Sequence, residues 1–398
     1  MKALLLENVH PDAESVLRAA GVAVAAEPGA LDESGLARAL VGVDLLGIRS
    51  KTQVSRAVLE AAPDLLAIGA FCIGTNQIDL DTASELGVAV FNAPFSNTRS
   101  VVELAIAEMI SLTRRLTEKN RSLHSGTWEK SASGAHEMRG RRLGIVGYGN
   151  IGSQLSVLAE ALGMSVVFYD TAEKLALGNA RSCESLDELL EIADVVTLHV
   201  DGRAGNAGLF EAAQLERMRP GAVFLNLSRG FVVDHHALAE HITSGHLAGA
   251  AIDVFPDEPS REGDPFDSDL RGLPNVILTP HIGGSTEEAQ QDIGGFVAGK
   301  LRDFVSAGST TLSVNLPPIS LDQQPGTHRL AHLHDNTPGV LAAVNGVLAE
   351  HQVNVEGQVL ATRGHVGYLL TDIGCDYAPD VVHALEGMPE TRRLRVLS

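Results

Sequence analysis

Short runs of apolar residues alternate along the chain with longer segments in which apolar residues recur at helical spacing. The short runs contain almost no charged residues, which is typical of parallel strands that helices cover on both faces. This alternation predicts an α/β fold in which strands and helices follow one another. In the first series, which ends near residue 95, strands are expected at 3–6, 45–48, 66–69 and 88–91.

A long helical pattern at about residues 101–121 separates this series from a second one. The apolar runs of the second series are also nearly free of charge, so we predict a doubly wound parallel sheet. Its strands are expected at 143–147, 166–169, 195–200, 223–227, 250–254 and 276–278.

A third unit follows a change of composition. Residues 307–326 are rich in Pro, Gly, Ser and Thr, which predicts a flexible linker. A helix is expected at 338–350, with Thr337 as its cap and Pro338 in its first turn. The patterns after the linker predict the ferredoxin-like order βαββαβ. Its other elements are expected to be strands at 329–334, 353–360, 366–373 and 393–397 and a helix at 379–387.

The composition is that of a globular protein with two or three domains: 398 residues, 44% of them hydrophobic and 20% charged. Thirty Lys and Arg residues against fifty Asp and Glu residues give a formal charge of −20, and there is no long basic run. Nucleic acid is therefore an unfavourable partner. No apolar stretch has the length of a membrane span or the pattern of a signal peptide, so a cytoplasmic protein is expected.

The three cysteines, Cys72, Cys183 and Cys375, are widely spaced and form no metal-ligand pattern. Their number is odd, so a disulfide framework is not expected. Buried, reduced thiols in a reducing compartment are the simpler interpretation, and no metal site is predicted.

A glycine motif, Gly147-Tyr-Gly149-Asn-Ile-Gly152, lies between a predicted strand and a helical pattern. Glycines at this spacing allow a tight turn and let backbone amides at a helix N-terminus approach a pyrophosphate. Asp170 ends the next predicted strand, where a carboxylate binds both ribose hydroxyls and repels a 2′-phosphate. The sequence thus predicts NAD as the cofactor in preference to NADP. The alternative is a structural glycine turn followed by a surface aspartate.

Ionisable residues of three complementary kinds follow neighbouring predicted strands of the second series. Arg229, Glu258 and His281 come after the strands at 223–227, 250–254 and 276–278. Ligands of open parallel sheets bind beyond the carboxyl ends of the strands, so these side chains are expected together beside the cofactor.

This trio suits hydride transfer at a 2-hydroxy acid. The Arg229 guanidinium offers a fork of donors to a carboxylate. His281 titrates near neutral pH and is suited to accept the hydroxyl proton, and Glu258 orients it. Singly, each residue has a plainer explanation, namely a surface charge, a loop carboxylate, or one of fifteen histidines. Their occurrence at three strand ends favours a catalytic site.

Three segments that contain these residues resemble signature blocks of the D-isomer-specific 2-hydroxyacid dehydrogenases. They are Asn-Leu-Ser-Arg-Gly-Phe-Val-Val-Asp (226–234), Asp-Val-Phe-Pro-Asp-Glu-Pro (253–259) and Pro-His-Ile-Gly-Gly-Ser-Thr (280–286). Segments 47–52, 71–77 and 91–101 resemble more narrowly the bacterial phosphoglycerate dehydrogenases of that family. The C-terminal unit resembles an ACT regulatory domain.

The resemblance implies a discontinuous, flavodoxin-like substrate-binding domain into which a Rossmann-type NAD-binding domain is inserted. The implied boundaries are 1–96 with 286–306 for the substrate-binding domain, 97–285 for the NAD-binding domain, 307–326 for the linker and 327–398 for the ACT domain.

The same resemblance implies that Arg229 binds substrate, Glu258 supports the histidine and His281 is the acid/base. The chain departs from the family in the loop 199–208, where Asp201 stands in place of a usual proline. This change affects the contacts expected with the adenine side of the cofactor. The residues implied to bind the cofactor are Gly147, Gly149, Asn150, Ile151, Gly152, Asp170, Leu227, Ser228, Arg229, Asp253, His281, Ile282, Gly283 and Gly284.

The phosphate of a phosphorylated substrate needs cations. Arg49 and Lys51, which follow a predicted strand, are the candidates, with Ser50 and Asn97 as further donors. A solvated strand end is the alternative explanation for both cations. By the resemblance, Trp128 and Lys130 belong to a segment that reaches the site of a neighbouring subunit.

His334, Asn336 and Asn354 match the residues that bind L-serine between subunits in serine-inhibited members of the family. The expected function is NAD-dependent oxidation of D-3-phosphoglycerate to 3-phosphohydroxypyruvate, the first step of phosphorylated L-serine biosynthesis, in a homotetramer inhibited by L-serine. One alternative is a dehydrogenase for another D-2-hydroxy acid, such as hydroxypyruvate/glycerate or 2-hydroxyglutarate. Another is a non-catalytic NAD(H)-sensing binding protein.

Overall fold

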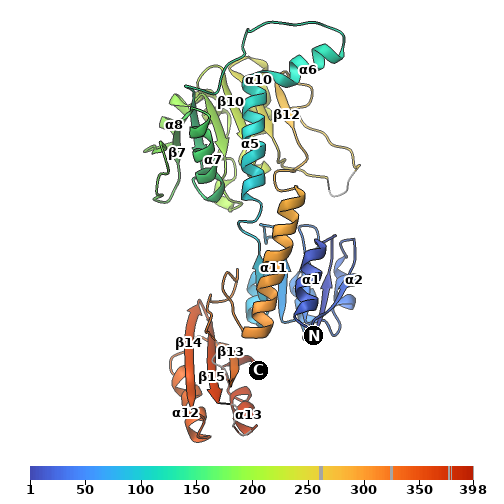
Figure 1. The fold of residues 1–398 in the computed structure, drawn as a ribbon, viewed down its shortest axis with the longest axis vertical. Helices are drawn as coiled ribbons and strands as arrows, with labels where there is room; N and C mark the ends of the chain where they lie inside the picture. Colours follow the sequence, from blue (N-terminus) through green and yellow to red (C-terminus); the bar gives the residue numbers. More distant parts are fainter. Residues whose placement is uncertain (260–262, 323–325, 375–376, 378, 398) are drawn as a thin grey trace. The chain divides into compact units, whose positions relative to one another are not determined.

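The computed structural model describes residues 1–259, 263–322, 326–374, 377 and 379–397. The chain forms two compact units (Figure 1). Unit 1 consists of Met1–Ser96 and Gln290–Ser398, and unit 2 consists of Asn97–Ala289. The long helix α11 (Glu287–Ala307) begins in unit 2 and continues into unit 1.

Unit 1 contains a parallel sheet of five strands in the order β2-β1-β3-β4-β5, which is the flavodoxin-like order. The sequence pattern did not predict β2, because its Ala-Val-Ala-Ala sequence is short and alanine is depleted in strands. The strands are β1 (Lys2–Leu5), β2 (Ala23–Ala26), β3 (Leu45–Ile48), β4 (Ala67–Ala70) and β5 (Ala89–Asn92). The helices between them are α1 (Pro11–Ala19), α2 (Glu33–Ala39), α3 (Arg56–Glu60) and α4 (Leu80–Glu85).

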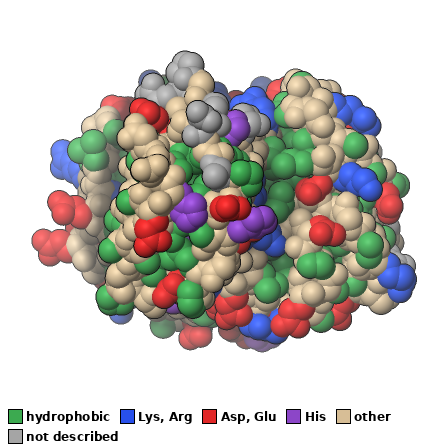
Figure 2. All heavy atoms as spheres, turned by 90° about the horizontal axis from the view of Figure 1, so that it is seen from below, with side chains coloured by type: hydrophobic (Ala, Val, Ile, Leu, Met, Phe, Trp, Pro, Cys, Tyr) green, Lys and Arg blue, Asp and Glu red, His purple; other side chains and the backbone are tan. Residues whose placement is uncertain are grey.

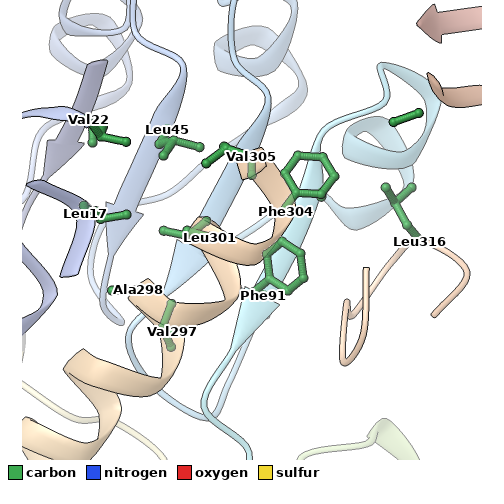
Figure 3. Close-up of a cluster of buried hydrophobic side chains, with 14 of the residues drawn as sticks. Leu17, Val22, Leu45, Phe91, Val297, Ala298, Leu301, Phe304, Val305 and Leu316 are labelled. Atoms are coloured by element: carbon green, nitrogen blue, oxygen red, sulfur yellow. The ribbon is translucent and has the colours of Figure 1, made fainter. Parts of the chain in front are cut away.

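Helix α11 contributes a row of apolar side chains to the buried core of unit 1 (Figure 3). Val297, Leu301 and Phe304 lie on this row and are at most 3% exposed. The ring of Phe304 packs on that of Phe91 at the end of β5, with centroids 5.8 Å apart. The chain therefore returns, after the whole of unit 2, to complete the core that residues 1–96 began.

The C-terminal part of unit 1 is an antiparallel sheet in the order β14-β15-β13-β16, the ferredoxin-like order that the sequence predicts. Inside it, Arg329 and Asp372 form a fully buried bidentate ion pair, with Nε–Oδ1 and Nη2–Oδ2 distances of 2.6 and 2.8 Å. The elements are β13 (Thr327–Asp335), α12 (Val340–Glu350), β14 (Val355–Arg363), β15 (Val366–Gly374), α13 (Asp380–Glu386) and β16 (Thr391–Leu397).

The described part of the linker 307–326 is not the flexible segment that its composition suggested. Val314 donates its amide to the Val90 carbonyl (2.8 Å), and the Asn315 side chain bonds the backbone of Val90 and Val88. The backbone of Val314 and the side chain of Asn315 extend the hydrogen bonding of the edge strand β5. Tyr368 of the antiparallel sheet and Leu316 of the linker share the core of Phe91, so the two sheets of unit 1 are packed together.

Unit 2 contains a parallel sheet of seven strands in the order β12-β11-β10-β9-β6-β7-β8, which is a doubly wound Rossmann-type order. The short edge strand β8 was not predicted. The strands are β6 (Arg142–Val146), β7 (Ser165–Tyr169), β8 (Arg181–Ser182), β9 (Val195–Leu198), β10 (Ala222–Asn226), β11 (Leu247–Ile252) and β12 (Val276–Leu278). The α-helices are α5 (Thr98–Thr113), α6 (Leu116–His124), α7 (Asn150–Ala161), α8 (Leu186–Ile192), α9 (Ala212–Arg217) and α10 (His235–Thr243).

Two helix predictions need correction. The single helix expected at 101–121 is two helices, because Arg115 adopts a left-handed backbone (φ 52°) that interrupts the helical hydrogen bonds. The helix expected at 338–350 begins at Val340, and its N-cap is Gly339 (φ 96°) instead of Thr337. Pro338 therefore lies in the turn before the helix.

Figure 2 shows Asp and Glu side chains distributed among Lys, Arg and hydrophobic side chains over one face of the molecule. Within the described ranges, no helix has the length and apolar character to cross a membrane. The same residues contain no cluster of three or more His, Cys, Asp or Glu side chains that could hold a metal ion. Cys183 is a buried thiol, Cys72 is only half-buried, and Cys375 lies outside the described residues.

Candidate active site

The glycine motif forms the turn between β6 and α7 in unit 2. Gly147 has φ 92°, and a Cβ there would lie 2.7 Å from the His199 carbonyl oxygen, so only glycine fits. Gly149 is the N-cap of α7, and a Cβ placed on it meets no heavy atom within 4 Å. The helix N-terminus therefore faces open space, which suits the approach of a pyrophosphate to its amides.

Asp170 lies at the carboxyl end of β7, next to this turn. Its carboxylate accepts the amides of Tyr148 and Ala172, both at 2.9 Å. The first bond ties the carboxylate to the glycine turn itself. The Asp170 carboxylate, which suits an adenosine ribose, therefore lies next to the amides of the glycine turn, which suit a pyrophosphate, at one edge of the sheet.

The turn that carries Arg229 is shaped by Asn226, the last residue of β10. The side-chain oxygen of Asn226 accepts hydrogen bonds from the backbone amide and the hydroxyl of Ser228, at 3.0 and 2.7 Å. Its side-chain nitrogen donates to the Arg229 carbonyl at 3.0 Å. A Cβ on the next residue, Gly230, would overlap the backbone of Phe255. Both features fix the path of the chain after β10, which passes close to the loop that contains Glu258.

Glu258 and His281 contact each other directly. His281 Nδ1 lies 2.8 Å from Glu258 Oε2, while Glu258 Oε1 accepts the Phe255 amide at 3.1 Å. The backbone therefore holds Glu258, and Glu258 in turn orients the imidazole of His281. His281 itself has a left-handed backbone (φ 55°), a conformation that costs free energy and is concentrated at functional sites.

The charges around this pair shift the pKa values of both members. The hydrogen bond to Glu258 raises the pKa of His281 above 6.5, although burial opposes this. The negative charges of Glu258 and Asp253 raise the pKa further. Partial burial favours the neutral form of Glu258, but the hydrogen bond and charge of His281 and the charge of Arg229 together lower its pKa. His281 is therefore a base of increased strength beside an ionised carboxylate.

Asp253 holds the turn that follows His281. Its carboxylate accepts the Thr279 hydroxyl at 2.6 Å and the amides of Ile282 and Gly283, both at 2.8 Å. Asp253 is 1% exposed, so these bonds satisfy a buried charge. Sequence reasoning assigned Asp253 to the cofactor. The structure shows in addition how it positions the turn, and the hydroxyl of Thr279 was missed.

The loop after β9 departs from the pattern expected of the family, and its own side chains hydrogen-bond one another. Arg203 Nε and Nη2 form a bidentate pair with Asp201 at 2.7 and 2.6 Å, and Asn206 Nδ2 donates to Asp201. A Cβ on Gly202 would lie 3.3 Å from Arg229 Nε, so the loop lies beside the proposed substrate arginine. Arg203 and Asn206 therefore hold Asp201 at the position where a proline is expected.

The predicted phosphate-binding cations lie in unit 1, directly after β3. Ser50 and Lys51 are exposed and Arg49 is half-buried, and neither cation forms an ion pair with another described residue. The local backbone is held by Glu7, whose carboxylate accepts the amides of Lys51 and Thr52 at 3.0 and 2.8 Å. Sequence reasoning missed Glu7, because its partners are more than forty positions away.

Two other predicted substrate residues belong to unit 2. Asn97 is the N-cap residue of α5, and its buried Oδ1 has no hydrogen-bond partner among the described residues. Lys130 lies in the exposed segment after α6, close to Trp128, whose side chain is 78% exposed. A tryptophan this exposed is unusual in a folded chain.

Two of the three predicted effector residues line one hollow in the C-terminal part of unit 1. His334 and Asn336 line a hollow of about 450 Å³, together with Asn345 and Leu360, which sequence reasoning did not identify. Asn336 donates to the Gly364 carbonyl at 3.0 Å. Asn354 is not among the lining residues and donates to Glu356 at 2.8 Å.

Comparison with known proteins agrees with this geometry. The family described as D-isomer specific 2-hydroxyacid dehydrogenase, NAD binding domain, matches residues 106–283. The family described as AHAS small subunit-like ACT domain matches residues 330–393.

Full-length relatives extend the match to the whole chain. D-3-phosphoglycerate dehydrogenase of Escherichia coli K12 is 49% identical over 400 residues, which is 100% of this chain and 97% of the relative. The enzyme of the same name from Haemophilus influenzae is 48% identical with equal coverage. The solved structure of D-2-hydroxyisocaproate dehydrogenase superposes with a TM-score of 0.72 at 26% identity, over 79% of this chain and 100% of that one. The chain therefore belongs to the D-isomer-specific 2-hydroxyacid dehydrogenases, binds NAD, and carries an ACT domain.

Proposed function

We propose that the protein oxidises D-3-phosphoglycerate to 3-phosphohydroxypyruvate with NAD, as the first step of phosphorylated L-serine biosynthesis. The observation that carries the proposal is the 2.8 Å contact of His281 with Glu258, at the sheet edge to which β10 also delivers Arg229. The names of the full-length relatives support phosphoglycerate as the substrate.

The residues of unit 2 have different roles in the proposed reaction. Arg229 binds the substrate carboxylate through its guanidinium fork. His281 accepts the proton of the C2 hydroxyl at Nε2, because Nδ1 is engaged by Glu258. Glu258 stabilises the imidazolium that results. Gly149 to Gly152 and Asp170 would hold the pyrophosphate and ribose of NAD, which would supply the hydride acceptor for C2.

Arg49 and Lys51 bind the phosphate of the substrate in this proposal. Both lack an ion-pair partner among the described residues of unit 1, so their charges are free for an anion. The rival substrates, hydroxypyruvate/glycerate and 2-hydroxyglutarate, differ from phosphoglycerate at this end of the molecule. A non-catalytic NAD(H)-sensing protein would have no need of the pair formed by His281 and Glu258.

The C-terminal domain adds regulation to the proposal. L-serine binds at His334 and Asn336, at the hollow in front of α12, and Asn354 contributes from a paired domain in a homotetramer. His334 is 3% exposed, and its buried Nε2 has no hydrogen-bond partner within the described part of the chain, which supports a polar ligand there. Trp128 and Lys130 contact a neighbouring subunit in the same assembly.

The test is a hydride-transfer assay with phosphoglycerate, and in reverse with phosphohydroxypyruvate, hydroxypyruvate and 2-oxoglutarate, each with and without L-serine. We expect the highest kcat/KM for the phosphorylated pair and inhibition by L-serine. Equal or higher kcat/KM for an unphosphorylated acid would assign the enzyme to that acid. Binding of NADH without turnover of any of these acids would favour the sensor.

A further inference from the structure

Two buried side chains from distant parts of unit 1 hold the segment 49–54, which follows β3. They belong to Glu7 and Gln77, which are 7% and 4% exposed. Glu7 lies just after β1, and Gln77 lies in the loop between β4 and α4. The segment contains Arg49 and Lys51, so the path of its backbone determines where the two proposed phosphate-binding side chains begin.

Glu7 binds the middle of the segment. Its two carboxylate oxygens accept the successive amides of Lys51 and Thr52, at 3.0 and 2.8 Å. Thr52 is fully buried, so the surroundings strengthen its bond to the carboxylate. Each backbone amide has a single hydrogen to donate. Both amides are therefore engaged, and a phosphate at this segment has to be bound by other groups, chiefly the side chains of Arg49 and Lys51.

Gln77 binds the segment at both ends. Its side-chain nitrogen donates to the Arg49 carbonyl at 2.6 Å, and its backbone carbonyl accepts the Val54 amide at 2.8 Å. Val54 also forms a parallel bridge with Ile78, the residue after Gln77. The segment is thus fixed where it begins and where it ends, as well as in its middle.

The backbone at Glu7 has an unfavourable conformation. Glu7 and the next residue, Asn8, are both left-handed, with φ 62° and 54°. Residues other than glycine rarely adopt this conformation, which costs free energy and is concentrated at functional sites. The two residues follow the carboxyl end of β1, the side of a parallel sheet at which ligands bind. Their conformation therefore favours a functional role for the turn.

We propose that Glu7 and Gln77 are positioning residues for the phosphate of the substrate, because they hold the backbone from which Arg49 and Lys51 extend. This inference rests on the proposed function and deepens it for one end of the substrate. Loss of one of these bonds leaves both cations in the chain, but binding of the phosphate must then also order the segment. Hydride transfer takes place at the other end of the substrate, so affinity should suffer more than turnover.

The first measurement compares the steady-state kinetics of wild type and Glu7→Gln with phosphoglycerate and D-glycerate. The variant keeps the shape of the side chain but turns an NH₂ group toward a backbone amide that needs an acceptor. The KM for phosphoglycerate should rise about 10-fold, and kcat and the KM for D-glycerate should change far less. Glu60→Gln, in an exposed pair with Arg56 in unit 1, is the matched control. An unchanged KM for phosphoglycerate, or equal changes for both substrates, would overturn the inference.

The second measurement shows whether Glu7 acts through the two cations. In a chain that already carries Arg49→Gln and Lys51→Gln, the further change Glu7→Gln should raise the KM for phosphoglycerate by less than about two-fold, because the side chains that it positions are absent. A purely structural effect would add in full to the effect of the double variant, and that result would refute the positioning role. Gln77→Met removes the donor to the Arg49 carbonyl and gives the same comparison if Glu7→Gln does not fold.

The third measurement needs no substrate. Hydrogen exchange of the Lys51 and Thr52 amides should be faster in Glu7→Gln than in wild type and in Glu60→Gln, because the variant opens these bonds locally. Unchanged exchange would show that Glu7 does not hold the segment. A wild type that prefers D-glycerate to phosphoglycerate would refute the proposed function and the phosphate role with it. A wild type that prefers phosphoglycerate, with an unchanged KM in Glu7→Gln, would refute the role of Glu7 alone.

Discussion

His281 Nδ1 and Glu258 Oε2 lie 2.8 Å apart, although 23 positions separate the two residues. The side chains of His281 and Glu258 are 49% and 36% exposed, so a substrate can reach the free edge of the imidazole. The contact fixes the ring through Nδ1 and leaves Nε2 for the substrate proton.

Replacement of His281 by Asn should remove most turnover and leave NADH binding intact, because the imidazole acts on the substrate proton and not on the cofactor phosphates. Loss of general acid–base catalysis lowers kcat by about 10²–10⁴-fold. Steady-state kinetics and NADH fluorescence titration measure the two quantities. Near-normal kcat would remove His281 from the acid/base role.

The pH profile should depend on Glu258. Oxidation needs neutral His281, so kcat/KM rises with pH through the pKa of His281, which Glu258 raises above 6.5. In Glu258→Gln that pKa falls, so the rising limb moves to lower pH while kcat drops by about 10-fold or more. Glu216→Gln, at the exposed contact with His241, is the control that should leave the limb unmoved. An unshifted limb in Glu258→Gln would contradict the coupling.

Asp170 should determine cofactor choice. Asp170→Ala removes a charged acceptor for the ribose hydroxyls and a charge that repels a 2′-phosphate, so the Kd for NAD should rise about 10-fold and the preference over NADP should narrow. Asp187→Ala, on an exposed pair with Arg217, is the matched control. Wild-type preference for NADP would show that Asp170 does not have this role.

Replacement of Arg49 and Lys51 together by Gln should raise the KM for phosphoglycerate by about 10²-fold, since two charge-assisted contacts are lost. The KM for an unphosphorylated analogue should change far less. Arg56→Gln, on an exposed pair with Glu85 in unit 1, controls for net charge. Equal changes for both substrates would place the phosphate elsewhere.

L-serine inhibition should require Asn336 and Asn354. Asn336→Ala removes a lining group of the hollow in front of α12, and Asn354→Ala removes the group expected from a paired domain. Each change should weaken inhibition without lowering uninhibited kcat, and their effects should combine. His383→Ala, on the exposed face of α13, should keep wild-type inhibition. Inhibition that is unchanged in the Asn336→Ala, Asn354→Ala double variant would exclude this site.

Local patterns were sufficient to predict the α/β class, the doubly wound order and the ferredoxin-like C-terminal unit. Apolar runs such as β3 and β10 form strands in which every residue is buried, so their sequences report their structure directly. The glycine turn and the three strand ends with Arg229, Glu258 and His281 are equally local. Parallel strands bring their carboxyl ends to one edge, so adjacency of these side chains followed from the class of sheet.

Other features arose only from contacts between distant segments. The left-handed Arg115 divides a continuous helical pattern, and Asn315 and Val314 bind β5 from a segment whose composition suggested a flexible linker. Glu7 shapes the backbone of Lys51, and the buried carboxylate of Asp253 holds the turn that follows His281. Hydrogen bonds of this range and the desolvation of a carboxyl group depend on what surrounds a residue in space. A linear pattern specifies which face of a helix is buried, but the partners that a buried polar group finds there, or lacks, are decided by the tertiary packing alone.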